Sequence, residues 1–198
     1  MILDKPGSYV IILSGLLAIV TVAAAAPAKL EVCAECHGED GSGAGFDNVP
    51  IIAGTPAAHL EEAIYAYQDG ARRCAIEPKM CETVAELSAD EIIELAEHFA
   101  ALRRLSSGEP FDASLAVAGE RLHEEHCAIC HVLPEAEDVA DAIGIPLHGQ
   151  RSEYLRLALD AYFNGDRDTL VEKMEEKLEL LDAADFEALI NYYASYSP

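Results

Sequence analysis

Two five-residue segments of the chain each bring two cysteines and a histidine together. The segment "CAECH" contains Cys33, Cys36 and His37, and the segment "CAICH" contains Cys127, Cys130 and His131. Two residues between the paired cysteines place their thiols about one helical turn apart, so both can bond to the same edge of a porphyrin. The adjacent histidine then projects from that turn toward the iron. The spacing therefore predicts two sites of covalent haem c attachment.

A lone C-x-x-C pair is also typical of a thiol redox pair or of half a zinc site. In this chain a histidine directly follows the second cysteine, and the whole pattern occurs twice. Both copies also follow an N-terminal segment with the features of an export signal. We therefore interpret the motifs as haem attachment sites.

The positions of the methionines repeat together with the motifs. Met1, Met80 and Met174 are the complete set. Met174 follows Met80 by 94 residues, and the same offset separates the two cysteine motifs. Each internal methionine therefore stands 43 residues after its motif histidine. This shared offset indicates an internal duplication.

The segments between the motifs also repeat, and they have helical patterns. The segment "HLEEAIYAYQDGAR" returns as "YLRLALDAYFNGDR" after 95 residues, and "LSADEIIELAEHFAAL" returns as "LDAADFEALINYYASY" after 94. Their apolar residues recur at helical spacing. Ser88 and Glu91 form a capping-box pattern that predicts a helix through Leu102, and Asp182 can cap its counterpart.

Length and composition limit the fold to a few helices around each cofactor. The chain has 198 residues, 51% of them apolar, and few segments alternate in the manner of strands. A module of fewer than about 90 residues is marginally stable alone, so we expect the haem to complete each core. The segment "RLSSGEPFDA" has the composition of a linker. The predicted fold is all-α, with cytochrome domains over 26–104 and 112–198 joined by a linker over 105–111.

The N-terminal segment has the features of a secretory signal. From Tyr9 to Ala26 the chain is uncharged, mostly apolar and rich in small residues at its end. Cleavage after Ala25 fits the A-x-A rule best, so residues 1–25 form the predicted signal peptide. The stretch is also just long enough to span a membrane, so a retained anchor is the alternative. Either outcome places the rest of the chain in the periplasm.

The chain is strongly acidic, with a formal net charge of −23. Such a surface repels nucleic acid phosphates and anionic lipid headgroups, so neither is an expected partner. Only five lysines are present. This composition suits high salt, where screening relieves self-repulsion, and it is equally compatible with simple solubility.

Together these motifs resemble the tandem class I diheme cytochromes c, over essentially all of the mature chain. In that family each iron takes the motif histidine and a methionine from a later loop. The resemblance therefore implies that His37 with Met80, and His131 with Met174, bind the two irons. It also implies a fold of two tandem class I cytochrome c domains related by internal duplication.

The second half resembles one group within this family more closely. The segments "FDASLAVAGERLHEEHCAICHV" and "VEKMEEKLELL…YYAS" are similar to the diheme cytochrome subunit of flavocytochrome c sulfide dehydrogenase. The short lead over 26–32 is similar too, whereas 112–126 provides a full helix before the second motif. The resemblance implies a subunit that accepts electrons from a sulfide-oxidising flavoprotein.

Two cysteines remain outside the motifs, and they flank one methionine. Cys74 and Cys81 lie in "RRCAIEPKMC". In an oxidising compartment, a disulfide between them would close a short loop around Met80 and add about 2.5 kcal/mol of loop-closure stabilisation. The alternatives are two unpaired thiols, a bridge to a partner, or a copper site that includes Met80. The copper site would remove the haem ligand, so we favour the disulfide.

Histidine–methionine ligation fills both axial positions of the iron and raises its potential. This arrangement leaves no position for a substrate, so we expect electron transfer and no catalytic residues. His148 in "IPLHGQ" is the strongest rival ligand, with a surface or supporting role as its ordinary interpretation, and His59 is another. The repeated methionine spacing favours the methionines.

Three functions remain compatible with these patterns. The first is an electron-transfer subunit docked on a sulfide-oxidising flavoprotein, and the second is a free diheme shuttle to a terminal oxidase or another reductase. The third is a diheme peroxidase, which needs an open iron position and is disfavoured by the paired methionines. For either of the first two, the acidic chain calls for a partner with a basic face.

The duplicated motif generates a direct prediction. We expect two covalently bound haems per chain, each low-spin with histidine and methionine ligands. A pyridine haemochrome assay on the purified protein measures the ratio, and a ferric spectrum reports the methionine–iron band. One haem per chain, or the absence of that band, would contradict the prediction.

Overall fold

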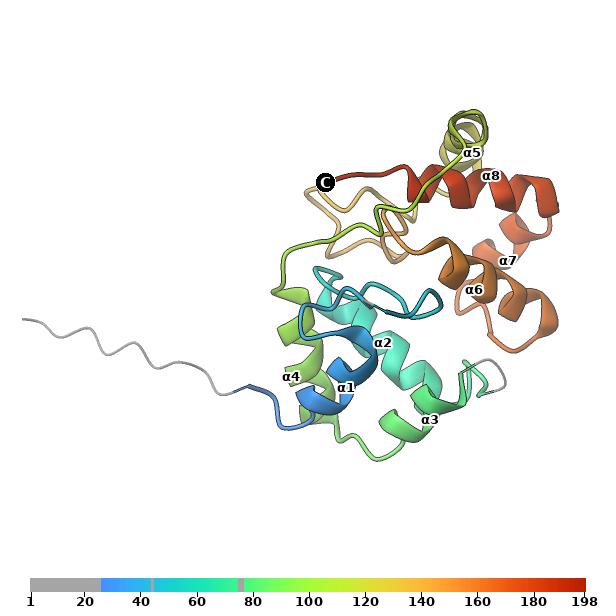
Figure 1. The fold of residues 1–198 in the computed structure, drawn as a ribbon. Helices are drawn as coiled ribbons and strands as arrows, with labels where there is room; N and C mark the ends of the chain where they lie inside the picture. Colours follow the sequence, from blue (N-terminus) through green and yellow to red (C-terminus); the bar gives the residue numbers. More distant parts are fainter. Residues whose placement is uncertain (1–25, 44, 75–76) are drawn as a thin grey trace, which may run out of the picture.

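The computed structural model describes residues 26–43, 45–74 and 77–198. The predicted signal peptide, residues 1–25, lies outside the described residues. Within them the regular structure is helical, as expected (Figure 1). The helices are α1 (Leu30–His37), α2 (Ala57–Gln68), α3 (Pro78–Val84), α4 (Ala89–Ala100), α5 (Ala113–His126), α6 (Ser152–Asn164), α7 (Glu172–Leu178) and α8 (Ala183–Ala194). None of the helices in this described part is long and apolar enough to cross a membrane.

The helix boundaries follow the sequence repeat. Helices α3 and α7 have seven residues each and begin 94 residues apart. Helices α4 and α8 have twelve residues each and share that offset. Helices α2 and α6 begin 95 residues apart. One order of helices therefore occurs twice, and Figure 1 shows α1 to α4 below α6 to α8.

The predicted capping box at the start of α4 is present. The Ser88 hydroxyl accepts a hydrogen bond from the Glu91 backbone N–H at 3.3 Å, and the Glu91 carboxylate accepts one from the Ser88 N–H at 2.9 Å. Asp182 caps α8 in the same reciprocal way with Asp185. Helix α4 ends at Ala100, two residues before its predicted end.

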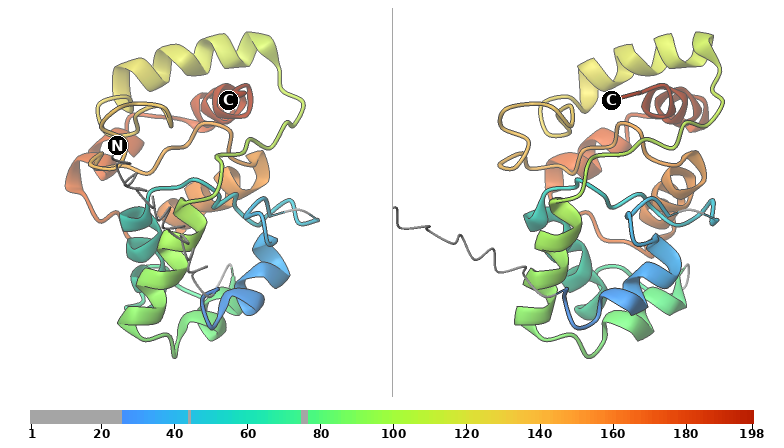
Figure 2. Two further views of the ribbon diagram at one scale, coloured as in Figure 1. Left: turned by 90° about the vertical axis from the view of Figure 1, so that its left-hand side faces the viewer. Right: turned by 60° about the vertical axis from the view of Figure 1, so that its left-hand side comes forward.

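The two halves differ most at their first helix. Helix α5 has fourteen residues and is capped by Asp112, whereas α1 has eight. Figure 2 shows α5 lying across α8. The contact is close because Gly119 of α5 has no side chain, and a Cβ there would meet the Ala188 carbonyl oxygen at 2.1 Å. The second half therefore has a closely packed pair of helices, α5 and α8, and the additional turns of α5 extend it beyond what the shorter α1 can provide in the first half.

Each half has a small apolar core of its own. In the first half, Leu60, Ala96 and Phe99 are buried together. In the second half the buried residues are Leu155, Leu189, Ile190 and Tyr193. One cysteine of each motif packs against its core, Cys33 in the first half and Cys127 in the second. The cores thus extend directly to the attachment cysteines.

Buried hydrogen bonds join the halves. Gln150 accepts from the Ile51 N–H at 2.8 Å and donates to the Ile51 carbonyl at 2.9 Å. Arg104 donates to Thr55 and to the carbonyls of Pro146 and His148. These bonds satisfy backbone groups that would otherwise be buried without a partner, so they hold the halves in one arrangement.

A second contact between the halves lies at equivalent positions of the repeat. Arg72 and Arg167 face each other in an isolated antiparallel β-bridge. The Arg73 N–H donates to the Asp166 carbonyl, and the Asp168 N–H donates to the Ala71 carbonyl, each at 2.7 Å. Because Arg72 and Arg167 match at the 95-residue offset, the two repeats meet here through the same segment.

Replacing Gln150 with leucine tests the buried connection. The change leaves the Ile51 N–H and carbonyl buried without partners, and we expect it to lower the free energy of unfolding by about 1–3 kcal/mol. Urea unfolding of the holoprotein should then separate into two transitions. The Gln150 change also removes the bond that Oε1 accepts from the Arg151 N–H. The matched control is Gln68→Leu, which removes two hydrogen bonds, to the Val84 and Leu87 carbonyls, that both lie within the first half. A single transition with an unchanged midpoint in the Gln150 variant would count against this role.

Candidate haem-binding sites

The first motif lies on α1. His37 is the last residue of that helix and is buried, with 7% of its surface exposed. Its Nδ1 lies 3.2 Å from the carbonyl oxygen of Pro50. Cys33 and Cys36 are half-buried on the same short helix. The helix thus presents both thiols and the imidazole within two turns.

The second motif lies in the turns that follow α5. The His131 N–H donates to the Cys127 carbonyl at 2.9 Å, so the motif keeps one helical turn. The Nδ1 atom of His131 lies 2.8 Å from the carbonyl oxygen of Ile145. Gly144 packs on this ring, where a Cβ would lie only 2.6 Å from Nδ1. A side chain at position 144 would therefore displace the histidine.

The carbonyl partners determine which imidazole nitrogen can bind a metal. A carbonyl oxygen only accepts, so Nδ1 of each ring carries the proton and donates it. Nε2 is then left with its lone pair for iron, which is the arrangement typical of metal-binding histidines. Burial lowers the pKa of both His37 and His131, and the carbonyl bonds oppose this effect. Both rings are accordingly kept neutral, as a ligand requires.

The four motif cysteines fit covalent attachment. None of them forms a disulfide with another described residue, although the members of each pair are three positions apart. Burial raises the pKa of Cys33 and of Cys127, so these thiols remain protonated. Each site therefore offers two available thiols and an oriented imidazole, which is the donor set that a haem c group needs.

The methionines occupy equivalent positions in the two halves. Met80 is the third residue of α3, and Met174 is the third residue of α7. Both are half-buried. The resemblance implied a loop, whereas the structure places them in short helices directly before α4 and α8. Their role as iron ligands stays a prediction.

A disulfide joins Cys74 and Cys81, with 5.9 Å between their Cα atoms. It ties the start of α3 to the chain that precedes it, so Met80 lies inside the closed loop. The bridge has no counterpart in the second half, where positions 168 and 175 are Asp168 and Glu175. It restrains only the first methionine segment.

Two arginines and three tyrosines form a cluster for which the sequence alone predicted no role. Arg72 lies over the Tyr67 ring at 5.4 Å, and Arg167 lies over the Tyr162 ring at 4.7 Å. Burial alone would raise the pKa of Tyr154, but the guanidinium groups of Arg167 and Arg72 outweigh it and lower that pKa. The Tyr-x₄-Arg spacing that occurs in both halves could have indicated this cluster. One arginine from each half gives a pair of positive charges, which is suited to binding an anionic group.

The rival histidines are buried and contact other side chains. His148 is 1% exposed, and its Nε2 lies 3.3 Å from the Tyr192 hydroxyl. It packs edge-on against His123 in an aromatic cluster between α5 and α8. The surface location considered for His148 is therefore wrong. His59 is also buried, with its Nδ1 3.9 Å from Glu62.

The chain is similar in sequence to curated proteins that are named as electron acceptors or cytochromes. The chain is 31% identical over 153 residues to a thiosulfate dehydrogenase electron acceptor from Thiomonas intermedia, which covers 73% of this chain and 68% of that protein. It is 30% identical over 181 residues to cytochrome c4 from Pseudomonas aeruginosa, with 86% of each chain covered. No protein-family model matches.

Solved structures support the same arrangement. A thiosulfate dehydrogenase from Marichromatium purpuratum superposes with a TM-score of 0.67 and 28% identity, over 83% of this chain and 36% of that one. Cytochrome c4 from Acidithiobacillus ferrooxidans superposes with a TM-score of 0.70 and 24% identity, over 84% and 99% of the two chains. The second comparison shows the expected fold of two tandem class I cytochrome c domains.

Substituting the methionines tests their role as ligands. We expect Met80→Ala to open the sixth position of the first haem only, removing about half of the methionine–iron band and lowering that potential. Met174→Ala should have the mirror effect, and each variant serves as the control for the other. Spectroelectrochemistry measures both changes. An unchanged spectrum and potential in the Met80 variant would assign the ligand role to another group.

Proposed function

The chain belongs to the diheme cytochrome c family that includes cytochrome c4 and the electron acceptors of thiosulfate dehydrogenase, and on this premise we propose that it accepts electrons from a sulfur-oxidising dehydrogenase. Its cofactors are two covalent haem c groups. The observation that carries the proposal is the duplicated C-x-x-C-H motif, with a carbonyl-bonded histidine in each copy. Such a protein transfers electrons and is not itself a catalyst.

The residues of each half have separate tasks in this function. Bound haem supplies one-electron chemistry through its iron. The cysteines would hold the group in place, and the histidine would offer Nε2 to its iron. Met80 and Met174 would fill the other axial position, which excludes substrates and favours outer-sphere electron transfer. Arg72 and Arg167 would balance the negative propionate groups where the halves meet.

The relatives favour thiosulfate as the compound that the donor oxidises. One of the relatives described above is named as an acceptor for thiosulfate dehydrogenase. The sulfide-oxidising flavoprotein expected from the second-half resemblance receives no specific support from these comparisons. The electron donor that we propose is therefore still a sulfur-oxidising enzyme, but a thiosulfate dehydrogenase instead of a sulfide-oxidising flavoprotein. A free diheme shuttle to a terminal oxidase or another reductase is the second candidate, because the match to cytochrome c4, whose name mentions no dehydrogenase, covers 86% of the chain.

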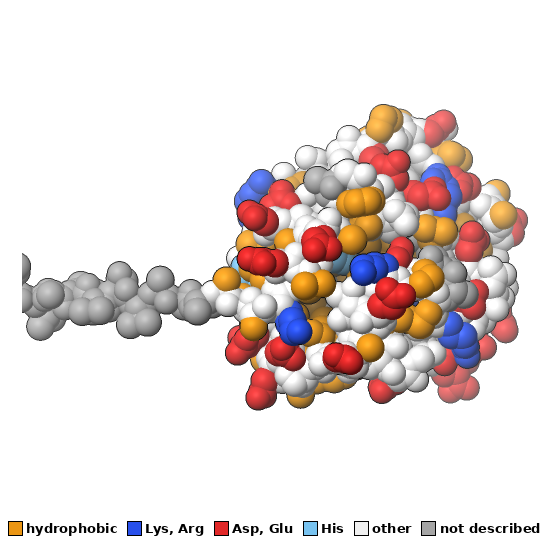
Figure 3. All heavy atoms as spheres, turned by 60° about the horizontal axis from the view of Figure 1, so that its bottom comes forward, with side chains coloured by type: hydrophobic (Ala, Val, Ile, Leu, Met, Phe, Trp, Pro, Cys, Tyr) orange, Lys and Arg blue, Asp and Glu red, His pale blue; other side chains and the backbone are white. Residues whose placement is uncertain are grey.

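The surface charge supports a basic partner. The formal net charge is −23, and Figure 3 shows acidic side chains spread over one face with few basic ones. Haem propionates would add further negative charge. Opposite charges accelerate encounter, and this steering weakens as salt screens it over a Debye length of about 8–10 Å.

We also propose a periplasmic location for the protein and the limits of its two domains. Haem attachment at C-x-x-C-H and the apolar segment over 1–25 support export to the periplasm, with cleavage after Ala25. The domain limits of 26–104 and 112–198 are supported by the helix-free stretch over 103–112 that precedes α5. Both are parts of the proposed function.

Stopped-flow reduction of the purified holoprotein tests the function. We expect thiosulfate with a thiosulfate dehydrogenase to reduce both haems, at a rate that falls as salt is raised. The control replaces the dehydrogenase by a sulfide-oxidising flavoprotein with sulfide. Reduction only in that control would restore the flavoprotein assignment, and reduction in neither would reject a sulfur-oxidising donor. Gel filtration in high salt then separates a docked subunit from a free shuttle.

A further inference from the structure

The two halves differ in the residues that surround their cysteine motifs. At the 94-residue offset, Glu35 and Glu39 of the first half correspond to Ile129 and Leu133 of the second. Ile129 is 90% exposed and Leu133 is 49% exposed. Exposed acids at the first motif are thus replaced by exposed apolar residues at the second. Glu35 and Ile129 occupy equivalent positions of the repeated fold, and so do Glu39 and Leu133. The fold alone therefore does not explain why one half has acids and the other has apolar residues there.

A third exposed apolar residue joins these two. The Gly144 N–H donates to the Cys130 carbonyl at 3.1 Å, which brings the loop before Gly144 against the motif. Ile143 in that loop is 66% exposed. We call Ile129, Leu133 and Ile143 the apolar patch. Because Ile129 lies between Cys127 and Cys130, the patch would border the edge of a haem attached at these cysteines.

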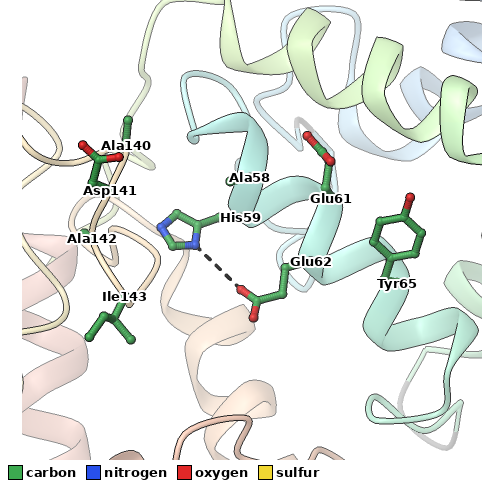
Figure 4. Close-up of a pocket in the computed structure, with 9 residues that line it drawn as sticks. All are labelled: Ala58, His59, Glu61, Glu62, Tyr65, Ala140, Asp141, Ala142 and Ile143. Atoms are coloured by element: carbon green, nitrogen blue, oxygen red, sulfur yellow. Dashed lines mark ion pairs between the residues drawn. The ribbon is translucent and has the colours of Figure 1, made fainter.

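Ile143 also lines a pocket that the first half shares. This acidic pocket has a volume of about 510 Å³ and lies between α2 and the loop over 140–143. Three of its lining residues are acidic, Glu61, Glu62 and Asp141, and Figure 4 shows the first two on α2 and Asp141 on the facing loop. The apolar patch and the acidic pocket are therefore continuous through Ile143.

His59 adds a buried polar group to the pocket. Its ring is 7% exposed, and its Nε2 is buried without a hydrogen-bond partner among the described residues. In Figure 4 the ring points from α2 toward the loop that contains Asp141. Burial lowers the pKa of His59, so the ring is neutral and does not cancel the carboxylates. The pocket thus combines net negative charge with an unsatisfied polar atom.

The matching positions of the second half do not carry acidic side chains. At the 95-residue offset, Glu61 and Glu62 correspond to Arg156 and Leu157. Arg156 is paired with Glu187 at 2.8 Å and with Glu153 at 3.6 Å. Its charge is therefore already balanced within the chain. Among the described residues, the two acids that α2 contributes to the pocket are therefore not repeated at the equivalent positions of α6.

We propose that the apolar patch and the acidic pocket form the docking surface for a basic redox partner, which places a lysine or arginine side chain in the pocket and exchanges electrons through the second haem. This inference rests on the proposed electron-transfer function. An apolar centre with charge at its rim is the usual composition of a specific interface. A haem held by Cys127, Cys130 and His131 would accept one electron per encounter from the reduced centre of the partner, with no bond formed or broken. Repulsion between two molecules of charge −23 disfavours a second copy of this chain as the occupant.

The first experiment measures binding to a lysine-rich cytochrome c, a basic redox protein that serves as the probe. Ile129→Glu and Glu62→Gln should each weaken binding, by about tenfold for the double variant. Carbodiimide crosslinking with mass spectrometry should join Glu61, Glu62 or Asp141 to lysines of the probe. The matched control is Glu35→Ile, which alters the equivalent position of the first half and should not weaken binding. Unchanged haem spectra establish that the variants fold.

The second experiment repeats the kinetics with thiosulfate dehydrogenase and the same variants. The inference is supported if Ile129→Glu and Glu62→Gln slow reduction while Glu35→Ile does not. It is overturned if the patch variants bind the probe like the wild type, or if crosslinks map to carboxylates around the first motif. If the dehydrogenase fails to reduce even the wild type while the probe still binds at the patch, the proposed function fails and the docking surface stands.

Discussion

A hydrogen bond from Nδ1 of each motif histidine to a backbone carbonyl is the interaction on which the rest of the structure depends. It orients the ring and leaves Nε2 for iron. The carbonyls belong to Pro50 and Ile145, and the residues that follow them also join the halves, through Ile51 and Gln150. Ligand orientation and domain arrangement are therefore set by the same two loops. A displacement of either loop would alter an iron ligand and the interface together.

The duplication provides two similar sites, and later differences give them different surroundings. The first half has a disulfide beside its methionine and acids beside its motif. The second half has the longer α5, a buried histidine and tyrosine cluster, and an apolar patch beside its motif. Since potential and access depend on the immediate environment of the iron, these differences are suited to two haems with unequal roles. The common fold supplies the ligands, and the surface distinguishes the sites.

Much of the fold was predictable because its signals are local. The capping box of Ser88 and Glu91 and the cap at Asp182 depend on residues within one helical turn, so the sequence indicates them directly. The repeat then transfers each helix from one half to the other. The helical form of the methionine segments was missed, since seven residues carry too little periodicity to distinguish a short helix from a loop.

The cysteines and histidines at a 94-residue offset specify two sites of haem c attachment, because covalent attachment requires fixed residue types at fixed spacing. The groups that surround these residues depend on how the chain folds. Every residue has a carbonyl, so no pattern singles out Pro50 and Ile145 as partners of the histidines. Likewise, His148 became a core residue, and His59 came to face the loop over 140–143, because packing brings together segments that are far apart in the chain. Local spacing specifies ligands, whereas burial and neighbours are properties of the folded chain.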